Sequence, residues 1–371
     1  MIKREWLFYL STLQGVGWKT LSQLMNLEQL DKISERNPLE LSVETGISFS
    51  LAETILKQIS IDSFKDAMNQ QKKWEQQGIQ LISYFDEDYP VLLKEINSPP
   101  WIIYAYGDIQ LLTEFKIAVV GTRHPTPYGQ AVCSAFTKDL ASNGWVIVSG
   151  LAKGIDKIAH EAALTVGGKT IAVLGNGVDV IYPRENKAIY QQILQKGLLL
   201  SEFAPGVQPR PGFFPQRNRI ISGLSHGTIV IEASLKSGSL ITAKDALEQS
   251  REVFAVPGPI TSKESTGTNL LIQQGAKLVQ RLEDINNEFP YFITEKIKIN
   301  NNHNNKSEET LSLHYNEKII YNLISSIKPI HINHIIESVQ FPISEVYENL
   351  LLLQIKSLIR QMPGNFYIRN S

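Results

Sequence analysis

The stretch IAVVGTRHPTPYGQAVCSAFTKDLASNGWVIVSG, residues 117–150, decides the fold class. It begins and ends with a short aliphatic run, and a helical segment around Cys133 lies between the two runs. Both runs are apolar at nearly every position, which is typical of strands that are covered on both faces. The order strand, loop, helix, strand predicts a unit in which two parallel strands are joined by a helix.

The same pattern repeats down the chain and predicts a doubly wound α/β core. Six strands are expected, at 117–121, 145–150, 170–175, 198–203, 228–234 and 253–258. Before them, the apolar segment 79–85 and the proline-punctuated segment that follows it read as an added flank of the same sheet.

The chain also predicts segments outside this core. Residues 1–62 read as short helices joined by glycine turns, resembling a helix-hairpin-helix or SAM-like domain, and 63–290 form the core. An asparagine-rich polar run marks 291–312 as a flexible linker. Residues 313–371 read as three helices and two strands, an order that resembles a winged helix. For both terminal domains, DNA contact and protein contact remain alternatives, and the acidic third helix of 313–371 favours protein contact.

Composition limits the function classes. The 371 residues carry a net charge of -1, so nucleic-acid binding would require a local basic strip. One cysteine excludes internal disulfides and multi-cysteine metal sites. The N-terminal apolar run is too short for a secretion signal and no segment reaches membrane-spanning length, so we expect a cytoplasmic protein without membrane contact.

A local basic strip is present at 205–242. No carboxylate occurs between Glu202 and Glu232, whereas Arg210, Arg217 and Arg219 fall there beside two adjacent phenylalanines. Arginines follow phosphates and exposed rings stack on unpaired bases, so this strip indicates single-stranded nucleic-acid binding. The alternative is a loop whose rings plug into the core.

Glycine-containing loops follow several of the predicted strands. They lie at 121–123, 149–154, 175–177, 237–239 and 267–269, where a doubly wound sheet collects its ligands. Several amide-rich loops along one edge suit a long anion, although such folds also need glycine at these turns for purely structural reasons.

Nucleotide, metal and catalytic signatures are missing from the sequence. GTRHPT after the first strand is not a dinucleotide fingerprint, and no nucleophile elbow is present. The histidines show no convincing ligand set. Asp156, Asp179 and Glu232 lie near strand ends, where each also has a capping or turn explanation. We therefore predict no catalytic residue, no metal and no cofactor.

A series of motifs resembles one family. VVGTRHPTPYG, IVSGLAKGIDKIAHEAAL, VLGNGVDVIYP, FPQRNRIISGLS, IEASLKSGSLITAKDALEQSREVFAVPG and STGTNLLIQQGA follow the order of the DNA processing protein A (DprA/Smf) family over about residues 80 to 280. The resemblance implies an extended Rossmann-like core that binds single-stranded DNA, forms homodimers and loads RecA recombinase during natural transformation, without catalysis.

The resemblance also implies a DNA-binding set. Its members are Arg123, Arg210, Phe214, Arg217, Arg219, Lys236, Ser237, Gly238, Ser239, Gly267, Thr268 and Asn269. If a helix opens at Pro215, Arg217 and Arg219 point to opposite sides, so one of them becomes a structural partner and Arg219 is favoured as the contact. Phe213 is expected to be packed and Phe214 exposed.

Two rival functions remain. One is a nucleotide phosphoribohydrolase of the lysine-decarboxylase-like group, but KSGSLITA lacks that group's PGGxGT loop and glutamate. The other is an interaction scaffold in which the arginines form internal ion pairs.

Overall fold

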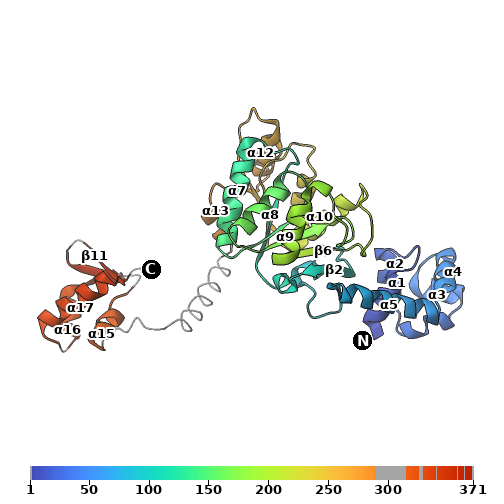
Figure 1. Cartoon of the computed structure of the whole chain (residues 1–371), viewed down its shortest axis with the longest axis horizontal. Coiled ribbons are helices and arrows are strands. Elements are labelled where there is room, and N and C mark those ends of the chain that lie inside the picture. Colours follow the sequence, from blue (N-terminus) through green and yellow to red (C-terminus); the bar gives the residue numbers. More distant parts are fainter. Residues whose placement is uncertain are drawn as a thin grey trace. The chain divides into compact units, whose positions relative to one another are not determined.

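The computed structural model describes residues 2–289, 315–325, 329–339, 341–356, 358–362 and 364–369. The chain divides into two compact units, Met1–Phe292 and Ile293–Ser371, and Figure 1 traces both from blue to red. The predicted linker at 291–312 lies outside the described residues. Among the helices of the described part, none is both long and apolar enough to cross a membrane.

A nine-stranded sheet in the order β1-β2-β6-β5-β4-β3-β7-β8-β9 forms the centre of the first unit. Strands β3 to β9 are parallel to their neighbours, whereas β1 pairs with β2, and β2 with β6, in antiparallel register. The strands are β1 (Ile79–Ser83), β2 (Ile102–Gly107), β3 (Lys116–Val120), β4 (Val146–Ser149), β5 (Thr170–Leu174), β6 (Leu198–Ser201), β7 (Gly227–Val230), β8 (Glu252–Ala255) and β9 (Lys277–Leu278). The six predicted strands are confirmed as β3 to β8, and the predicted flank is the β1–β2 pair.

The strand order places a switch point between β3 and β7. From β3 the chain moves through β4 and β5 to β6, and then returns to lay β7 on the other side of β3. Loops that leave β3 and β7 therefore diverge at this point, which opens a crevice at the carboxyl ends of the two strands.

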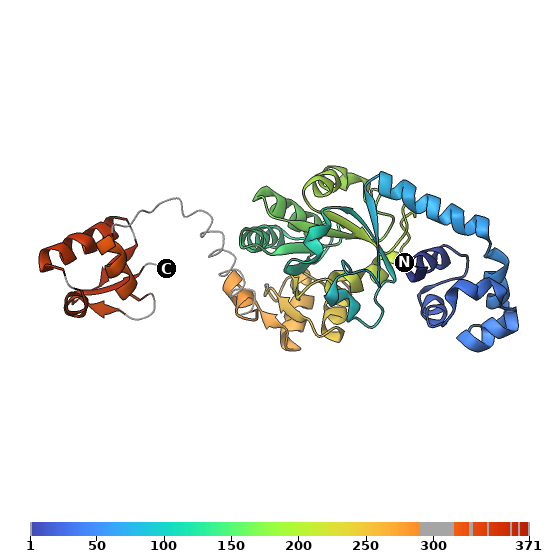
Figure 2. The ribbon, with the colours of Figure 1, turned by 90° about the horizontal axis from the view of Figure 1, so that it is seen from below.

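Helices cover both faces of this sheet (Figure 2). They are α6 (Val91–Lys94), α7 (Pro127–Ser142), α8 (Ile155–Thr165), α9 (Lys187–Lys196), α10 (Phe213–Gly223), α11 (Ser239–Glu248), α12 (Thr266–Gln273) and α13 (Leu282–Asn286). Helix α7 shows why such helices start where they do: Thr126 caps its N-terminus by accepting a hydrogen bond from the Gly129 amide, and Pro127 occupies its first turn.

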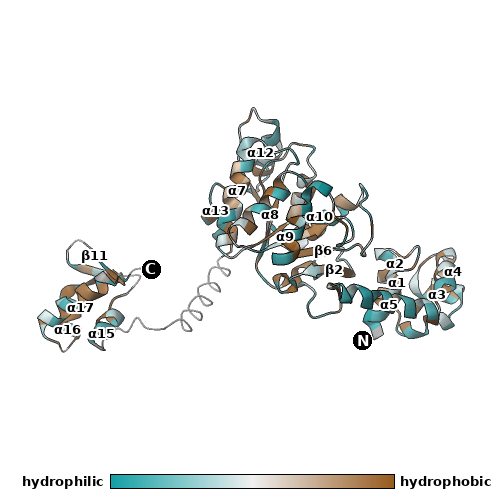
Figure 3. Ribbon diagram, in the orientation of Figure 1, coloured by the Kyte–Doolittle hydropathy of each residue, from teal (hydrophilic) through white to brown (hydrophobic). Residues whose placement is uncertain are grey.

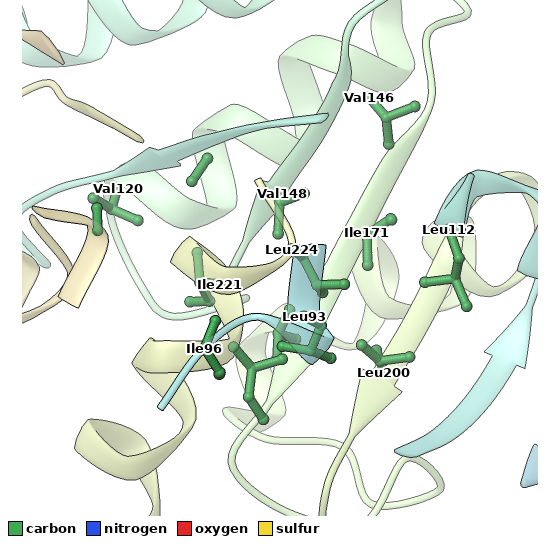
Figure 4. Packing of buried hydrophobic residues seen from close by; sticks show 14 of the residues in the cluster. Leu93, Ile96, Leu112, Val120, Val146, Val148, Ile171, Leu200, Ile221 and Leu224 are labelled. Atoms are coloured by element: carbon green, nitrogen blue, oxygen red, sulfur yellow. The ribbon is translucent and has the colours of Figure 1, made fainter. Parts of the chain in front are cut away.

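Alternate residues of each strand enter different cores. On β3, Ala118 and Val120 join the cluster beneath α10 and α11, part of which is drawn in Figure 4. Ile117 and Val119 join a second cluster with α7 and α8. Cys133 is fully buried in this second cluster, where burial raises the pKa of its thiol to about 12. The prediction of a packed, unreactive cysteine is confirmed.

The N-terminal helices pack on the antiparallel edge of the sheet (Figure 1). They are α1 (Ile2–Ser11), α2 (Trp18–Leu24), α3 (Pro38–Thr45), α4 (Phe49–Gln58) and α5 (Ile61–Gln76), with a 3-10 turn at Leu30–Glu35. Their apolar side chains share one cluster with Leu81 of β1 and Tyr104 of β2. The expected boundary at residue 62 falls inside α5, because this helix joins the N-terminal helices to the sheet. The helix-hairpin-helix assignment stays a prediction.

The second unit contains three helices and a three-stranded sheet in the order β10-β12-β11. Its elements are α15 (Tyr315–Leu323), β10 (Ile330–His331), α16 (Ile332–Ser338), α17 (Ile343–Ile355), β11 (Ile359–Met362) and β12 (Phe366–Arg369). The three expected helices and two expected strands are present, and the two-residue β10 is additional. The winged-helix assignment itself stays a prediction.

Candidate nucleic-acid interface

The carboxyl ends of the parallel strands border an open groove of about 650 Å³. A smaller cavity of about 50 Å³ adjoins it, and Arg123, Phe214 and Arg217 line both spaces. Of the predicted DNA-binding set, the groove is lined by Arg123, Phe214, Arg217, Lys236, Ser237, Gly238 and Ser239. The structure therefore brings together residues that are more than 110 positions apart in the chain.

Arg123 is an exposed cation on a rigid loop. The preceding Thr122 donates its amide to the Glu232 carbonyl at 2.8 Å, and its own carbonyl accepts the Ile155 amide at 3.2 Å. Gly154 is required beside this loop, because a Cβ there would lie 2.5 Å from the Thr122 oxygen. The Arg123 guanidinium lies 6.0 Å from the centre of the Phe214 ring. A fixed backbone with an exposed charge suits a phosphate contact.

The two adjacent phenylalanines have different surroundings. Phe213 stacks on Phe203 with ring centres 4.1 Å apart, whereas Phe214 stacks on Tyr182 at 5.4 Å and lines both spaces. Both rings are half-buried. The expectation of an exposed Phe214 is therefore corrected: its ring borders the groove, but Tyr182 and the backbone at Gly175 cover part of it.

Arg217 is 3% exposed and belongs to the wall of the groove. Its guanidinium donates hydrogen bonds to the carbonyl oxygens of Gly150, at 2.7 Å, and Val173. Burial lowers the pKa of Arg217 to about 10, and the charge of Asp156 opposes this change. The expected role in DNA contact is corrected, because these interactions hold the ends of β4 and β5 and direct the guanidinium into the protein.

Arg219 is also engaged inside the protein. It forms a 2.7 Å ion pair with Glu202, and the two side chains are 17% and 10% exposed. Burial raises the pKa of Glu202, while the Arg219 charge opposes the rise. Arg219 is not among the residues that line the groove. The preference for Arg219 as the DNA contact is therefore corrected. Helix α10 begins at Phe213, two residues before the assumed start, and both arginines on it are structural.

Lys236 and the serine turn form the opposite side of the groove. Lys236 is exposed, and Ser237 and Ser239 bond to each other through their hydroxyls at 2.7 Å. Gly238 precedes the first residue of the ten-residue helix α11. The turn thus places the first amides of α11 and an exposed ammonium at the groove.

The remaining predicted residues lie elsewhere. Arg210 is exposed 5.7 Å from the Phe213 ring, outside the groove lining. Gly267 donates its amide to the Ala233 carbonyl at 2.7 Å, and Thr268 is 1% exposed. Asn269 bonds to the backbone of Gly258. The loop 267–269 therefore attaches α12 to the end of β7, and its expected contact with DNA is corrected.

Three carboxylates near the strand ends bind backbone amides. Glu232, at the switch point, accepts hydrogen bonds from the Thr126 amide and hydroxyl at 2.9 and 2.6 Å. Asp156 accepts the amides of Gly150 and Ala152, and Asp179 accepts the amide of Gly206. Glu232 thereby occupies the N-terminus of α7, where a doubly wound fold would otherwise receive a nucleotide phosphate. The capping explanation of all three is confirmed.

Sequence reasoning missed several groove residues. Tyr182 supplies the second ring beside Phe214, Lys153 lines the smaller cavity, and His124 and Lys263 line the larger one. VLGNGVDVIYP, which contains Tyr182, was recognised as a motif, yet only the folded chain brings this tyrosine to the ring of α10.

The comparisons with known proteins agree with this geometry. The family model described as DNA recombination-mediator protein A matches residues 80–290. DNA processing protein DprA of Bacillus subtilis is 44% identical over 66% of this chain and 86% of its own length, and protein Smf of Escherichia coli is 40% identical over 79% and 78%.

Solved structures show the same relationship. DNA processing protein A from Streptococcus pneumoniae has a TM-score of 0.57 at 39% identity, covering 74% of this chain and 98% of its own. The Helicobacter pylori structure, whose title describes a single-stranded DNA binding mode, has a TM-score of 0.52 at 35% identity, covering 57% and 96%. The chain belongs to the DNA recombination-mediator protein A family.

Proposed function

We propose that the groove binds single-stranded DNA and performs no chemistry on it. The observation that carries the proposal is the combination, in one open groove, of the exposed cations Arg123, Lys236 and Lys263 with the stacked rings of Phe214 and Tyr182. Cations follow the phosphates of a strand, and rings accept unpaired bases of any sequence. The related Helicobacter pylori protein, described as binding single-stranded DNA, supports this function.

The position of the rings favours a single strand over a duplex. Phe214 and Tyr182 are partly recessed between loops, and the smaller cavity next to them is lined by main-chain atoms and side chains of three loops. A base must leave its stack to reach such rings, which costs unpairing energy in a duplex and little in a single strand.

Family membership supports two further parts of the proposal. The protein acts as a homodimer, and it loads RecA recombinase onto the bound strand during natural transformation. Sedimentation velocity tests the dimer. Loading is tested by the rate of RecA filament growth on single-stranded DNA coated with single-strand binding protein, which we expect this chain to increase.

The central experiment is a fluorescence anisotropy titration with a labelled single-stranded oligonucleotide at several salt concentrations. Neutralised phosphates release counterions, so log affinity should fall linearly with log salt. The double variant Arg123→Ala/Lys236→Ala should bind more weakly and show a slope that is flatter by about two units, one for each lost phosphate contact. An affinity independent of salt would contradict the proposal.

A matched control removes two cations that already have partners. Lys57 and Lys244 are exposed lysines paired with Glu53 and Glu248 on α4 and α11. Lys57→Ala/Lys244→Ala changes the net charge by the same amount as the test variant. Equal losses of affinity in the two double variants would show a general charge effect and no specific groove.

A further inference from the structure

The third helix of the second unit exposes a row of apolar side chains. Ile343, Tyr347 and Leu351 on α17 are 58%, 52% and 57% exposed. Residues four positions apart lie on one face of a helix, so the three form a continuous row. Figure 3 colours much of α17 brown, for hydrophobic residues. The cluster that stabilises the unit uses other positions of this helix, Val346, Leu350 and Leu353. The row is therefore apolar surface that the core of the second unit does not use.

The charges of α17 oppose nucleic acid. Glu348 is exposed beside the row, and Glu345 lies farther around the helix. Within Ile343–Ile355 there is no lysine or arginine. Lys356, which follows the helix, bonds to both oxygens of the buried Glu317 at 2.7 and 2.8 Å. A helix that approaches phosphates should carry cations at its leading end, whereas α17 carries carboxylates.

The same charges oppose pairing with a second copy of the helix. Two identical helices related by a twofold axis present the same patch to each other. If two rows packed together in this way, Glu348 would approach Glu348 of the second copy, and like charges on neighbouring helix positions are destabilising. A helix with cations beside its apolar row has no such cost.

We propose that the row on α17 docks a basic amphipathic helix of a protein partner. The partner presents apolar side chains at intervals of three or four residues, which pack against Ile343, Tyr347 and Leu351. Lysines or arginines along its flank face Glu345 and Glu348. Apolar contact provides the affinity, and the charges select a basic partner over an acidic one and over DNA.

The test uses the full chain and two synthetic amphipathic peptides with the same leucine spacing. One peptide carries lysine and the other glutamate at all remaining exposed positions, and circular dichroism checks their helicity. In fluorescence anisotropy we expect the basic peptide to bind at least about tenfold more tightly than the acidic one. Glu345→Lys/Glu348→Lys should reverse this order.

The contribution of the row is measured separately. Tyr347→Ser and Leu351→Ser should each weaken binding of the basic peptide by about tenfold or more, because each removes an apolar side chain that is buried on docking. Val43→Ser is the control, since Val43 is 77% exposed on α3 of the first unit. Thermal melting establishes that the variants remain folded.

Several outcomes would overturn the proposal. These are equal affinity for the two peptides, no binding of either, and row variants that bind like the wild type. A fall in self-association of Tyr347→Ser in sedimentation velocity would assign the row to a second copy. A fall in its DNA affinity would assign the row to nucleic acid.

Discussion

Arginines at the mouth of the groove and in its wall behave in opposite ways, although both kinds are found beside the same rings. Arg123 at the mouth is exposed and, among the described residues, forms no ion pair. Arg217 and Arg219 in the wall are bonded to main-chain carbonyls and to Glu202. A basic motif therefore contains two populations, one available to phosphate and one that shapes the site, and burial separates them.

The largest expected effect concerns the wall. Arg217→Met should lower the free energy of unfolding by about 3 to 5 kcal/mol, because it leaves Asp156 and two carbonyls without a buried charged partner. Thermal and urea melting measure this loss. DNA affinity per folded molecule should change little. A stable variant with lost affinity would place Arg217 at the mouth and remove the distinction.

The second effect separates the two rings. Phe214→Ala should lower the affinity for single-stranded DNA by about 1 to 3 kcal/mol, the range for stacking on a base. Phe213→Ala is the matched control, since its ring stacks on Phe203 and does not line the groove. We expect Phe213→Ala to lower the melting temperature more than the affinity. If Phe214→Ala instead lost stability at normal affinity per folded molecule, the roles of the two rings would be exchanged.

A smaller effect concerns the mouth. Arg123→Ala should weaken binding about fivefold near 0.1 M salt, following ~0.7 log unit for one phosphate contact on a single strand. The slope of log affinity against log salt should become less steep by the same ~0.7 unit. Arg219→Ala, in contrast, should reduce stability by leaving Glu202 unpaired, and it should keep the wild-type slope. An unchanged slope for Arg123→Ala would contradict the assignment.

The smallest effect is expected from removing the second unit. A chain that ends at Phe289 keeps the ring that packs on Trp145 and Phe254, and it keeps all groove residues. Its DNA affinity should stay within about a factor of two of the full chain, since α17 carries carboxylates and no cations. A large loss would show that the second unit adds to the mouth of the groove.

Sequence reasoning identified the strands because they are short aliphatic runs covered on both faces. The run at 117–121 became β3, whose alternate side chains enter two separate cores. It missed β9 because two residues carry no periodicity. It placed a domain boundary at 62, where the helical pattern of 61–76 is in fact continuous.

For the site, the exposed loop residues were easier to predict than the helical ones. Arg123, Lys236 and the serine turn line the groove as expected, because loops that follow parallel strands must meet at one edge of the sheet. The segment without carboxylates was a misleading signal, since Glu202 lies immediately before it. The end of β6 brings this glutamate to Arg219.

By itself, the sequence determined the α/β class, the order of the central elements and the family. Those properties follow from local hydrophobic pattern and motif order, which each segment carries alone. The tertiary structure alone decided which arginines are free, that Tyr182 stacks on Phe214, and that Glu232 closes the switch point. These properties depend on distances between segments up to 110 residues apart, and a charge or ring has no fixed role until its neighbours and its burial are set.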